Sequence, residues 1–214
     1  MITKILIADD HVIVREGLRR ILAADPTFVV TGEAGDGGEV MVAVQAGGFD
    51  VLLLDLSMPG RSGIDLVKRV KEERPELSVL VLSMHAEQQY AVRAIRAGAS
   101  GYLTKDTAST QLLAALRKVA AGGLFITPQV AEALALGLQS ADGELPHKRL
   151  TDREFEIFLM LAEGESVTGI AERLSLSVKT ASTHKTHILE KMKLGSIAEL
   201  VRYALEHHLL DSRA

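Results

Sequence analysis

The chain of 214 residues contains no cysteine and no tryptophan, and only 4% of its residues are aromatic. Without cysteine it can form no disulfide, no thiolate zinc site and no cysteine nucleophile. Its apolar runs, such as Val51–Leu54 and Val79–Leu82, are far shorter than a membrane span of about 20 residues. A single short apolar run precedes Asp9 and Asp10, which is not the pattern of a secretory signal. These absences predict a soluble, cytoplasmic protein with no membrane partner.

Charge and composition narrow the class of protein further. Acidic residues outnumber basic ones by 28 to 24, which gives a formal net charge of −4. This mild acidity argues against a chain that coats nucleic acid non-specifically, although it is compatible with a local basic patch. A content of 47% hydrophobic and 24% charged residues is ordinary for a globular protein and excludes general disorder. The length suggests one large domain or two small ones.

The first half of the chain alternates short apolar runs with helical patterns. The predicted strands are Ile5–Ala8, Phe28–Gly32, Val51–Leu54, Val79–Leu82 and Gly101–Thr104. The predicted helices are Val12–Ala24, Glu39–Ala46, Ile64–Glu73, Ala86–Arg96 and Ser109–Ala121. Strands that are almost wholly apolar are typical of a parallel sheet covered on both faces. Residues 1–121 are therefore predicted to form a doubly wound α/β domain with a five-stranded parallel sheet.

The second half contains no strand pattern. Residues 122–149 are predicted to be a linker that contains one helix over 128–138, where Pro128 suits a first turn. Beyond the linker, Ser or Thr start signals precede four helical patterns, over 152–162, 167–174, 178–193 and 197–208. Residues 150–214 are therefore predicted to be a small all-α domain.

Polar side chains follow four of the predicted strands. Asp9 and Asp10 follow the first strand, Asp55 the third, Ser83 the fourth and Lys105 the fifth. The carboxyl ends of such strands form the ligand-binding edge of an open α/β sheet. Clustered carboxylates suit Mg²⁺, and a hydroxyl and an ammonium beside them complete a site for a phosphoryl group. Each residue alone has an ordinary reading as a cap, a turn or a surface lysine, but the combination indicates a functional site with a nucleophilic carboxylate.

The first half also resembles a known family. Residues 2–121 closely resemble the receiver domains of two-component response regulators, which have a flavodoxin-like fold, through the segments 5–11 (ILIADDH), 53–60 (LLDLSMPG), 81–85 (VLSMH) and 101–105 (GYLTK). The resemblance implies that Asp55 accepts a phosphoryl group from a histidine kinase. It also implies that Mg²⁺ is the cofactor, held by Asp9, Asp10, Asp55 and the backbone carbonyl of Ser57.

The same resemblance implies a switch. Lys105 would pair with the phosphoryl oxygens and Ser83 would hydrogen-bond to one of them. Movement of Ser83 would let Tyr102 swing inward and alter the surface near the last strand. Two positions depart from the family pattern: Asp106 stands where many receivers have proline, and Met84 stands where Ala or Gly is usual. A bulky side chain such as Met84 at the pocket mouth would slow the entry of water or of the phosphoryl donor, so the sequence does not fix the lifetime of the phosphorylated form.

Positive charge in the second half gathers on one predicted helix. Residues 179–193 contain four lysines against one glutamate, a net charge of +3. A helix that carries Ser, Thr, Lys and His on one face can enter the major groove of DNA. On this pattern alone, a plain four-helix module with a solvated basic face remains an alternative.

Residue strings in the second half resemble the LuxR-type helix-turn-helix. They are residues 150–157 (LTDREFEI), 170–180 (IAERLSLSVKT), 182–185 (STHK) and 188–192 (ILEKM). With a receiver in front, the chain resembles a response regulator of the NarL/FixJ type. The resemblance makes 178–193 the recognition helix, with base-facing Ser182, Thr183 and Thr186. Its implied phosphate contacts are Lys179, Thr180, His184, Lys185 and Lys191.

The resemblance also implies partners. Core packing explains most of the apolar stripe of helix 197–208. The resemblance implies that part of this stripe pairs with a second copy when the protein is phosphorylated, giving a homodimer on an inverted repeat of double-stranded DNA. Contact with RNA polymerase is a further partnership that the resemblance allows. One departure lies in the helix-turn-helix: Val167, Thr168 and Gly169 replace the usual Asn-Lys-Glu, which removes a lysine and places a glycine in a predicted helix.

The sequence therefore predicts a DNA-binding transcription regulator rather than an enzyme. A Mg²⁺-dependent phosphohydrolase with Asp55 as nucleophile is one alternative, but no second acid/base carboxylate follows Asp55 at close spacing. A receiver that serves as a docking module without phosphorylation is another alternative. The complete set of site residues argues against it.

Overall fold

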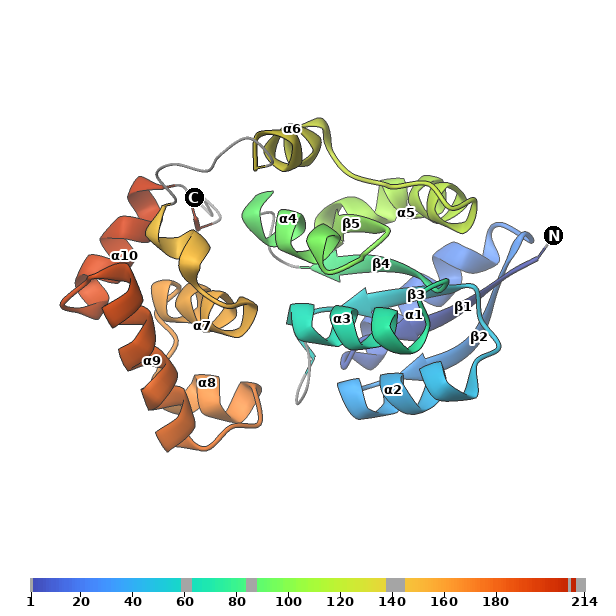
Figure 1. The fold of residues 1–214 in the computed structure, drawn as a ribbon. Coiled ribbons are helices and arrows are strands. Elements are labelled where there is room, and N and C mark those ends of the chain that lie inside the picture. Colours follow the sequence, from blue (N-terminus) through green and yellow to red (C-terminus); the bar gives the residue numbers. More distant parts are fainter. Residues whose placement is uncertain (1, 59–62, 84–87, 138–144, 208, 211–214) are drawn as a thin grey trace.

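The computed structural model describes residues 2–58, 63–83, 88–137, 145–207 and 209–210 (Figure 1). The strands are β1 (Thr3–Ala8), β2 (Phe28–Ala34), β3 (Val51–Asp55), β4 (Ser78–Ser83) and β5 (Gly101–Thr104). The helices of the first half are α1 (Val12–Ala23), α2 (Gly37–Ala46), α3 (Gly63–Glu73), α4 (Gln88–Arg96) and α5 (Lys105–Ala120). Strands and helices alternate along the chain, as the sequence predicts.

The strands form one parallel sheet in the order β2-β1-β3-β4-β5. Alternate residues of each central strand enter two different apolar clusters. Leu52 and Leu54 of β3 belong to the cluster on the side of α2, α3 and α4, whereas Val51 and Leu53 join the α1 and α5 side. Figure 1 shows these helices covering the two faces of the sheet. Burial on both faces explains why the strands read as continuous apolar runs.

Helix α5 begins earlier than the sequence predicts. The predicted start is Ser109, but the helix begins at Lys105 because the Thr104 side chain caps it by accepting a hydrogen bond from the Thr107 amide. The polar residues between Lys105 and Ser109 lack the apolar periodicity on which the prediction depended. The Lys105–Asp106 peptide bond is trans, and Met84 lies outside the described residues.

The predicted linker contains more structure than expected. Helix α6 (Pro128–Gly137) occupies the predicted span 128–138, of which residue 138 is not described. Ahead of it, Phe125 pairs with the edge strand β5: its amide donates to Ser100 and its carbonyl accepts from Tyr102. A short 3-10 helix, η1 (Pro146–Arg149), stands at the end of the predicted linker. Its His147 is fully buried, which the polar sequence around it does not indicate.

The second half folds into α7 (Asp152–Ala162), α8 (Val167–Arg173), α9 (Val178–Met192) and α10 (Ile197–Glu206). Each helix begins after the Ser or Thr that the sequence predicts as its cap. The turn between α8 and α9 passes through Ser175, whose φ of 51° is left-handed. The predicted α10 extends to residue 208, which is not described. None of the described helices is long and apolar enough to span a bilayer.

Candidate functional site

The polar residues that follow the strands meet at the carboxyl edge of the sheet. Asp55 is the last residue of β3 and Ser83 the last residue of β4. Ser83 is opposite Thr104 in the β4–β5 register, so it lies beside the strand end that leads into Lys105. Asp9 follows β1 directly, and its amide donates to Ala34 at the end of β2. The parallel topology therefore gathers residues from four strand ends into one site.

Lys105 joins the two buried carboxylates of this site. Its Nζ lies 2.7 Å from Oδ2 of Asp9 and 2.8 Å from Oδ2 of Asp55. Asp9 and Asp55 are each only 1% exposed, and Ser83 is fully buried. The Ser57 amide donates to Oδ1 of Asp55 at 3.0 Å. Buried carboxylates require such partners, because an unpaired charge away from water is very costly.

Burial and charge act against each other on the two central groups. Burial raises the pKa of the Asp55 carboxyl, and the Lys105 ammonium lowers that pKa by less. Burial alone would lower the pKa of Lys105, but Asp55 and Asp9 together outweigh it, so this pKa is raised and the ammonium stays charged at neutral pH. Two buried carboxylates against one ammonium leave an excess of negative charge at the sheet edge.

The carboxylate cluster fits a divalent cation. Ligand atoms of Asp9, Asp10, His11 and Asp55 all lie within 4.8 Å of one another. Among the described residues, Oδ1 of Asp10 is buried and accepts no hydrogen bond of suitable geometry, although the Nδ1 of His11 is close to it. A cation at this point would use that oxygen and offset the excess negative charge. Carboxylate oxygens are the ligands that Mg²⁺ prefers, usually with several waters retained. The sequence did not single out His11, whose Nδ1 is 2.9 Å from Oδ1 of Asp10.

The remaining predicted receiver residues are close to the same edge. Tyr102 is in β5 and is buried in the same apolar cluster as Tyr90 and Ala91 of α4. Ser57 presents its amide to Asp55; the role predicted for its carbonyl as a metal ligand stays a prediction. The switch roles of Ser83 and Tyr102 also stay predictions.

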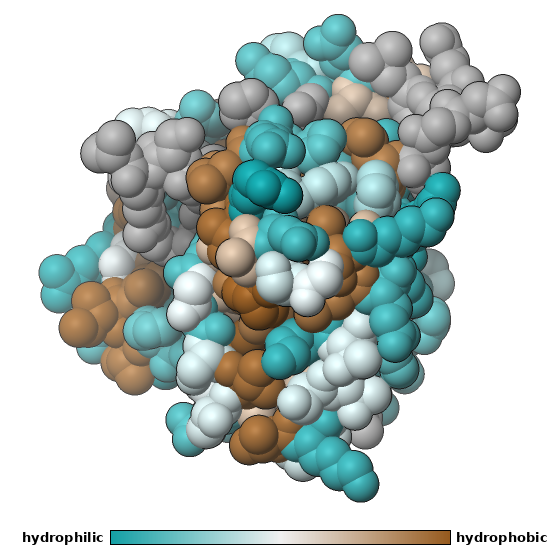
Figure 2. Space-filling view, turned by 90° about the vertical axis from the view of Figure 1, so that its left-hand side faces the viewer, coloured by the Kyte–Doolittle hydropathy of each residue, from teal (hydrophilic) through white to brown (hydrophobic). Residues whose placement is uncertain are grey.

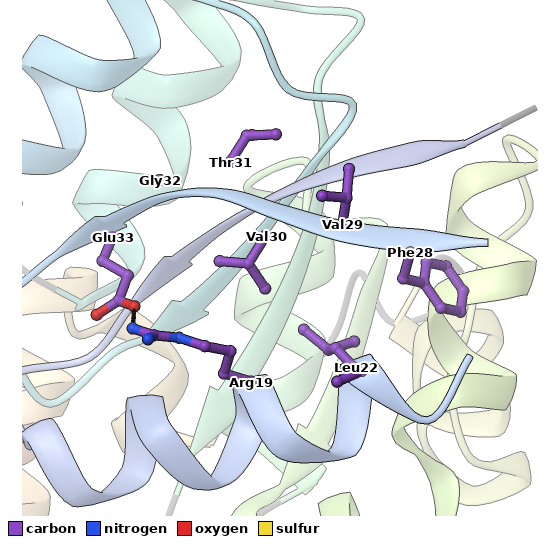
Figure 3. Close-up of a pocket in the computed structure, with 9 residues that line it drawn as sticks. Arg19, Leu22, Phe28, Val29, Val30, Thr31, Gly32 and Glu33 are labelled. Atoms are coloured by element: carbon purple, nitrogen blue, oxygen red, sulfur yellow. Dashed lines mark hydrogen bonds and ion pairs between the residues drawn. The ribbon is translucent and has the colours of Figure 1, made fainter. Parts of the chain in front are cut away.

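A pocket elsewhere on this domain does not belong to the site. It has a volume of about 520 Å³ and lies between α1 and β2, lined by Leu22, Phe28 and Val30 (Figure 3). At its mouth Arg19 forms an ion pair with Glu33. None of the residues predicted for the phosphoryl site lines this pocket.

The second candidate site is the outer face of α9. The exposed residues of the predicted DNA-binding set are Lys179, Thr180, Ser182, Thr183, Thr186 and Lys191, whereas His184 and Lys185 are half-buried. Ala181, Ile188 and Met192 are buried on the opposite face. Figure 2 views this side of the molecule, where hydrophilic and weakly polar side chains are interrupted by apolar patches. The helix therefore divides into the polar and apolar faces that the sequence predicts.

Two residues of the set have partners within the domain. Lys191 donates to Oε2 of Glu154 at 2.7 Å, so its ammonium is held against α7. The Thr180 hydroxyl is 2.7 Å from that of Ser177, the residue that caps α9. Burial lowers the pKa of His184, which favours its neutral form. The predicted phosphate contacts of these three side chains stay predictions.

A contact between the two halves was not predicted from the sequence. Arg93 of α4 donates to the carbonyls of His147 and Leu150, and to the carboxylate of Asp152. Its guanidinium carbon is 4.3 Å from the centroid of the Phe155 ring. A single arginine on a predicted helix carries no sequence signal for such a contact, because its partners are distant in the chain.

Comparison with known proteins agrees with both halves of the molecule. Residues 5–117 match the family described as "Response regulator receiver domain", and residues 148–204 match "Bacterial regulatory proteins, luxR family". The chain belongs to the response regulators that join a receiver to a LuxR-type DNA-binding domain, the NarL/FixJ type.

Relatives and solved structures cover nearly the whole chain. The oxygen regulatory protein NreC of Staphylococcus carnosus is 39% identical over 97% of this chain and 99% of its own length. The response regulator GacA of Pseudomonas aeruginosa is 35% identical over 98% of each chain. A structure of the response regulator RcsB of Salmonella typhimurium has a TM-score of 0.72 at 30% identity, covering 96% of this chain and 98% of that one. An RcsB–DNA complex has a TM-score of 0.59 at 32% identity, covering 95% and 98%. The chain is therefore a DNA-binding response regulator.

Proposed function

We propose that phosphorylation of Asp55 controls the DNA binding of this response regulator. The observation that carries the proposal is the ammonium of Lys105 between the buried carboxylates of Asp55 and Asp9. In the transfer, an Oδ atom of Asp55 bonds to phosphorus while the phosphorus–nitrogen bond of a kinase phosphohistidine breaks. Lys105 then pairs with the phosphoryl oxygens and the Ser83 hydroxyl donates to one of them.

The metal site of this proposal comprises Asp9, Asp10, Asp55 and the Ser57 carbonyl, and Mg²⁺ is the cation. When bound, Mg²⁺ neutralises charge on the phosphoryl group during transfer. The chain itself supplies the nucleophile, the lysine and the buried surroundings. The phosphoryl group on Asp55 carries a charge of about −2 and three acceptor oxygens, enough to move Ser83 and allow Tyr102 to swing inward.

On the DNA side, we infer that α9 enters the major groove. Ser182, Thr183 and Thr186 face the bases, and the phosphate contacts are Lys179, Thr180, His184, Lys185 and Lys191. Support comes from the exposure of most of these side chains on one face of the helix and from the RcsB structures with DNA. We assign residues 1–121 to the receiver, 122–149 to the linker and 150–214 to the DNA-binding domain.

The partners follow from the same proposal. A sensor histidine kinase supplies the phosphoryl group, and the phosphorylated protein is a homodimer on an inverted repeat. A structure of two RcsB dimers bound to two parallel DNAs supports the homodimer. RNA polymerase is the partner through which such a regulator acts on transcription. The protein meets its DNA in the cytoplasm. It acts as a regulator and not as an enzyme.

The test uses DNA selected from a random duplex pool by the protein treated with beryllium fluoride and Mg²⁺. Footprints on that DNA are compared with and without the treatment, in the parent and in Asp55→Asn. Asp65→Asn is the matched control, because Asp65 is exposed on α3. We expect stronger protection after treatment in the parent and the control, and no change in Asp55→Asn. Equal footprints in every case would refute control by phosphorylation.

A further inference from the structure

Helix α7 is buried on more sides than a helix of a small independent domain usually is. Every residue from Glu154 to Ala162 is buried. One side of this helix faces α8, α9 and α10, and another faces α3 of the receiver. A helix buried all round has neighbours on every side, and Figure 1 shows α7 between the receiver and helices α9 and α10. The receiver thus completes the burial of α7.

Arg93 is the centre of this interdomain contact, which we define as Lys68, Tyr90 and Arg93 against the segment 147–155. Its Nη1 donates to the Leu150 carbonyl and to Oδ1 of Asp152, both at 2.9 Å, and its Nη2 donates to the His147 carbonyl at 3.0 Å. The side chain is 14% exposed. A planar guanidinium donates in several fixed directions while its flat face stacks on an aromatic ring, a combination that the compact ammonium of lysine does not offer.

Further groups strengthen the same contact. Lys68 of α3 forms an ion pair with Asp152. The Tyr90 ring stacks on Phe155 with centroids 6.2 Å apart. Tyr90 and Arg93 are three residues apart and so share a face of α4. One apolar cluster runs from the sheet through Tyr90 to Phe155. The contact is therefore continuous with the cores of both domains.

The recognition helix takes no part in this contact. In the described part of the chain, no hydrogen bond or ion pair joins α9 to the receiver. Lys179, Ser182, Thr183 and Thr186 are exposed, and α9 and α10 lie on the side of α7 away from the sheet (Figure 1). The docked arrangement therefore leaves the DNA-facing surface uncovered.

We propose that Arg93 holds the DNA-binding domain against the receiver without masking α9, and that phosphorylation releases this hold by moving α4. The inference rests on the proposed control through Asp55. Tyr102, the predicted switch residue, is in β5, which packs against α4, and it shares an apolar cluster with Tyr90, so a change at Tyr102 can act on the helix that carries Arg93. A docked domain cannot adjust to a two-fold axis, so the contact restrains binding to paired half-sites rather than to one half-site.

The first test measures the distance between the domains. Because the chain has no cysteine, spin labels can be attached at Gln111→Cys on α5 and Glu172→Cys on α8 in the full-length protein. We expect a narrow distance distribution in the untreated parent and a broad one after beryllium fluoride and Mg²⁺. Arg93→Ala should be broad without treatment. The matched control is Arg96→Ala, which removes an exposed arginine from the same helix.

Arg93→Lys separates loss of the contact from a folding defect, because it keeps the charge but cannot donate to all three acceptors while stacking on Phe155. We expect this variant to give a distance distribution of intermediate width. Its circular dichroism spectrum should match that of the parent. Parent-like distributions in both Arg93→Ala and Arg93→Lys would overturn the proposal.

The second test uses duplexes with one or two half-sites of the selected DNA. Untreated Arg93→Ala should bind the paired duplex at least about fivefold more tightly than the parent, and the single half-site within about twofold. An equal gain on both duplexes would show that α9 is masked and would overturn the proposal. If treatment strengthened protection in Asp55→Asn as much as in the parent, the proposed function would be refuted instead, whatever the distances show.

Discussion

The Nζ atom of Lys105 lies 2.8 Å from Oδ2 of Asp55, the predicted phosphoryl acceptor, and 2.7 Å from Oδ2 of Asp9. This one ammonium offsets two carboxylates that are each 1% exposed. Lys105 therefore neutralises buried charge in the fold as well as serving the proposed phosphoryl site, and the two roles can be separated by substitution.

Lys105→Met should destabilise the receiver by about 2–4 kcal/mol without metal, because two buried carboxylates are left without their cation. Mg²⁺ should then stabilise the variant more than the parent, since the excess negative charge at the site has grown. Thermal unfolding with EDTA and with Mg²⁺ measures both effects. Lys4→Met, at an exposed position of β1, should match the parent in both conditions. A smaller gain from Mg²⁺ in Lys105→Met than in the parent would contradict the metal site.

His147 should make stability fall in mild acid. Its side chain is fully buried, and burial lowers its pKa from 6.5 to about 4, with smaller contributions from His207, Arg93 and Lys148. Between pH 6.5 and about 4, His147 is protonated in the unfolded chain but stays neutral in the folded chain. The stability that neutral His147 contributes to the folded state is therefore complete above pH 6.5 and is lost as the pH falls towards 4.

Denaturant unfolding across this pH range tests the prediction in His147→Gln and in the exposed control His187→Gln. The loss of stability on acidification should be smaller in His147→Gln than in the parent and unchanged in the control. Parallel curves for all three proteins would show that His147 does not titrate in this way.

The glycine in α8 should be replaceable. A Cβ on Gly169 would meet only the Ser166 hydroxyl, at 3.4 Å, so Gly169→Ala should stabilise the domain by about 0.5–1 kcal/mol through helix propensity. Gly164 has a φ of +90°, and Gly164→Ala should instead destabilise by about 1 kcal/mol or more. Chemical denaturation compares the two. A loss of stability in Gly169→Ala would mean that this departure from the family pattern is required by the fold.

Contacts with phosphates and with bases should differ in their dependence on salt. Lys179→Ala should weaken binding to all duplexes and reduce the salt slope by about 1. Ser182→Ala should leave the slope unchanged and relax the preference at one base pair. Titrations of selected and scrambled duplexes at several salt concentrations measure both, with Lys4→Ala as the control. A changed salt slope in Ser182→Ala would show that this side chain contacts a DNA phosphate rather than a base.

Sequence reasoning predicted the parts of this molecule that depend on local pattern. The β3 run from Val51 to Leu54 is apolar because both faces are covered, and the Ser and Thr caps marked the starts of the second-domain helices. The edge of the sheet could be predicted as well, because parallel strands place their following residues together.

The missed features depend on contacts between distant segments. The α5 start at Lys105 depends on a cap by Thr104 that precedes a polar turn. The sequence predicts a linker around His147, but this side chain is buried against Tyr203, whose hydroxyl is 2.8 Å from its Nδ1. The contacts of Arg93 connect residues more than 50 positions apart. No periodicity within one helix encodes such partners.

The pairing of Phe125 with β5 has a consequence for association between chains. In the strand order, β2 and β5 are the two edges of the sheet, and an unpaired edge is a template for another strand. Phe125 occupies backbone groups of Ser100 and Tyr102 at the β5 edge. Any pairing with a strand of another chain would therefore be directed to β2, where Val29 is 40% exposed, and a charged side chain at Val29 should oppose it.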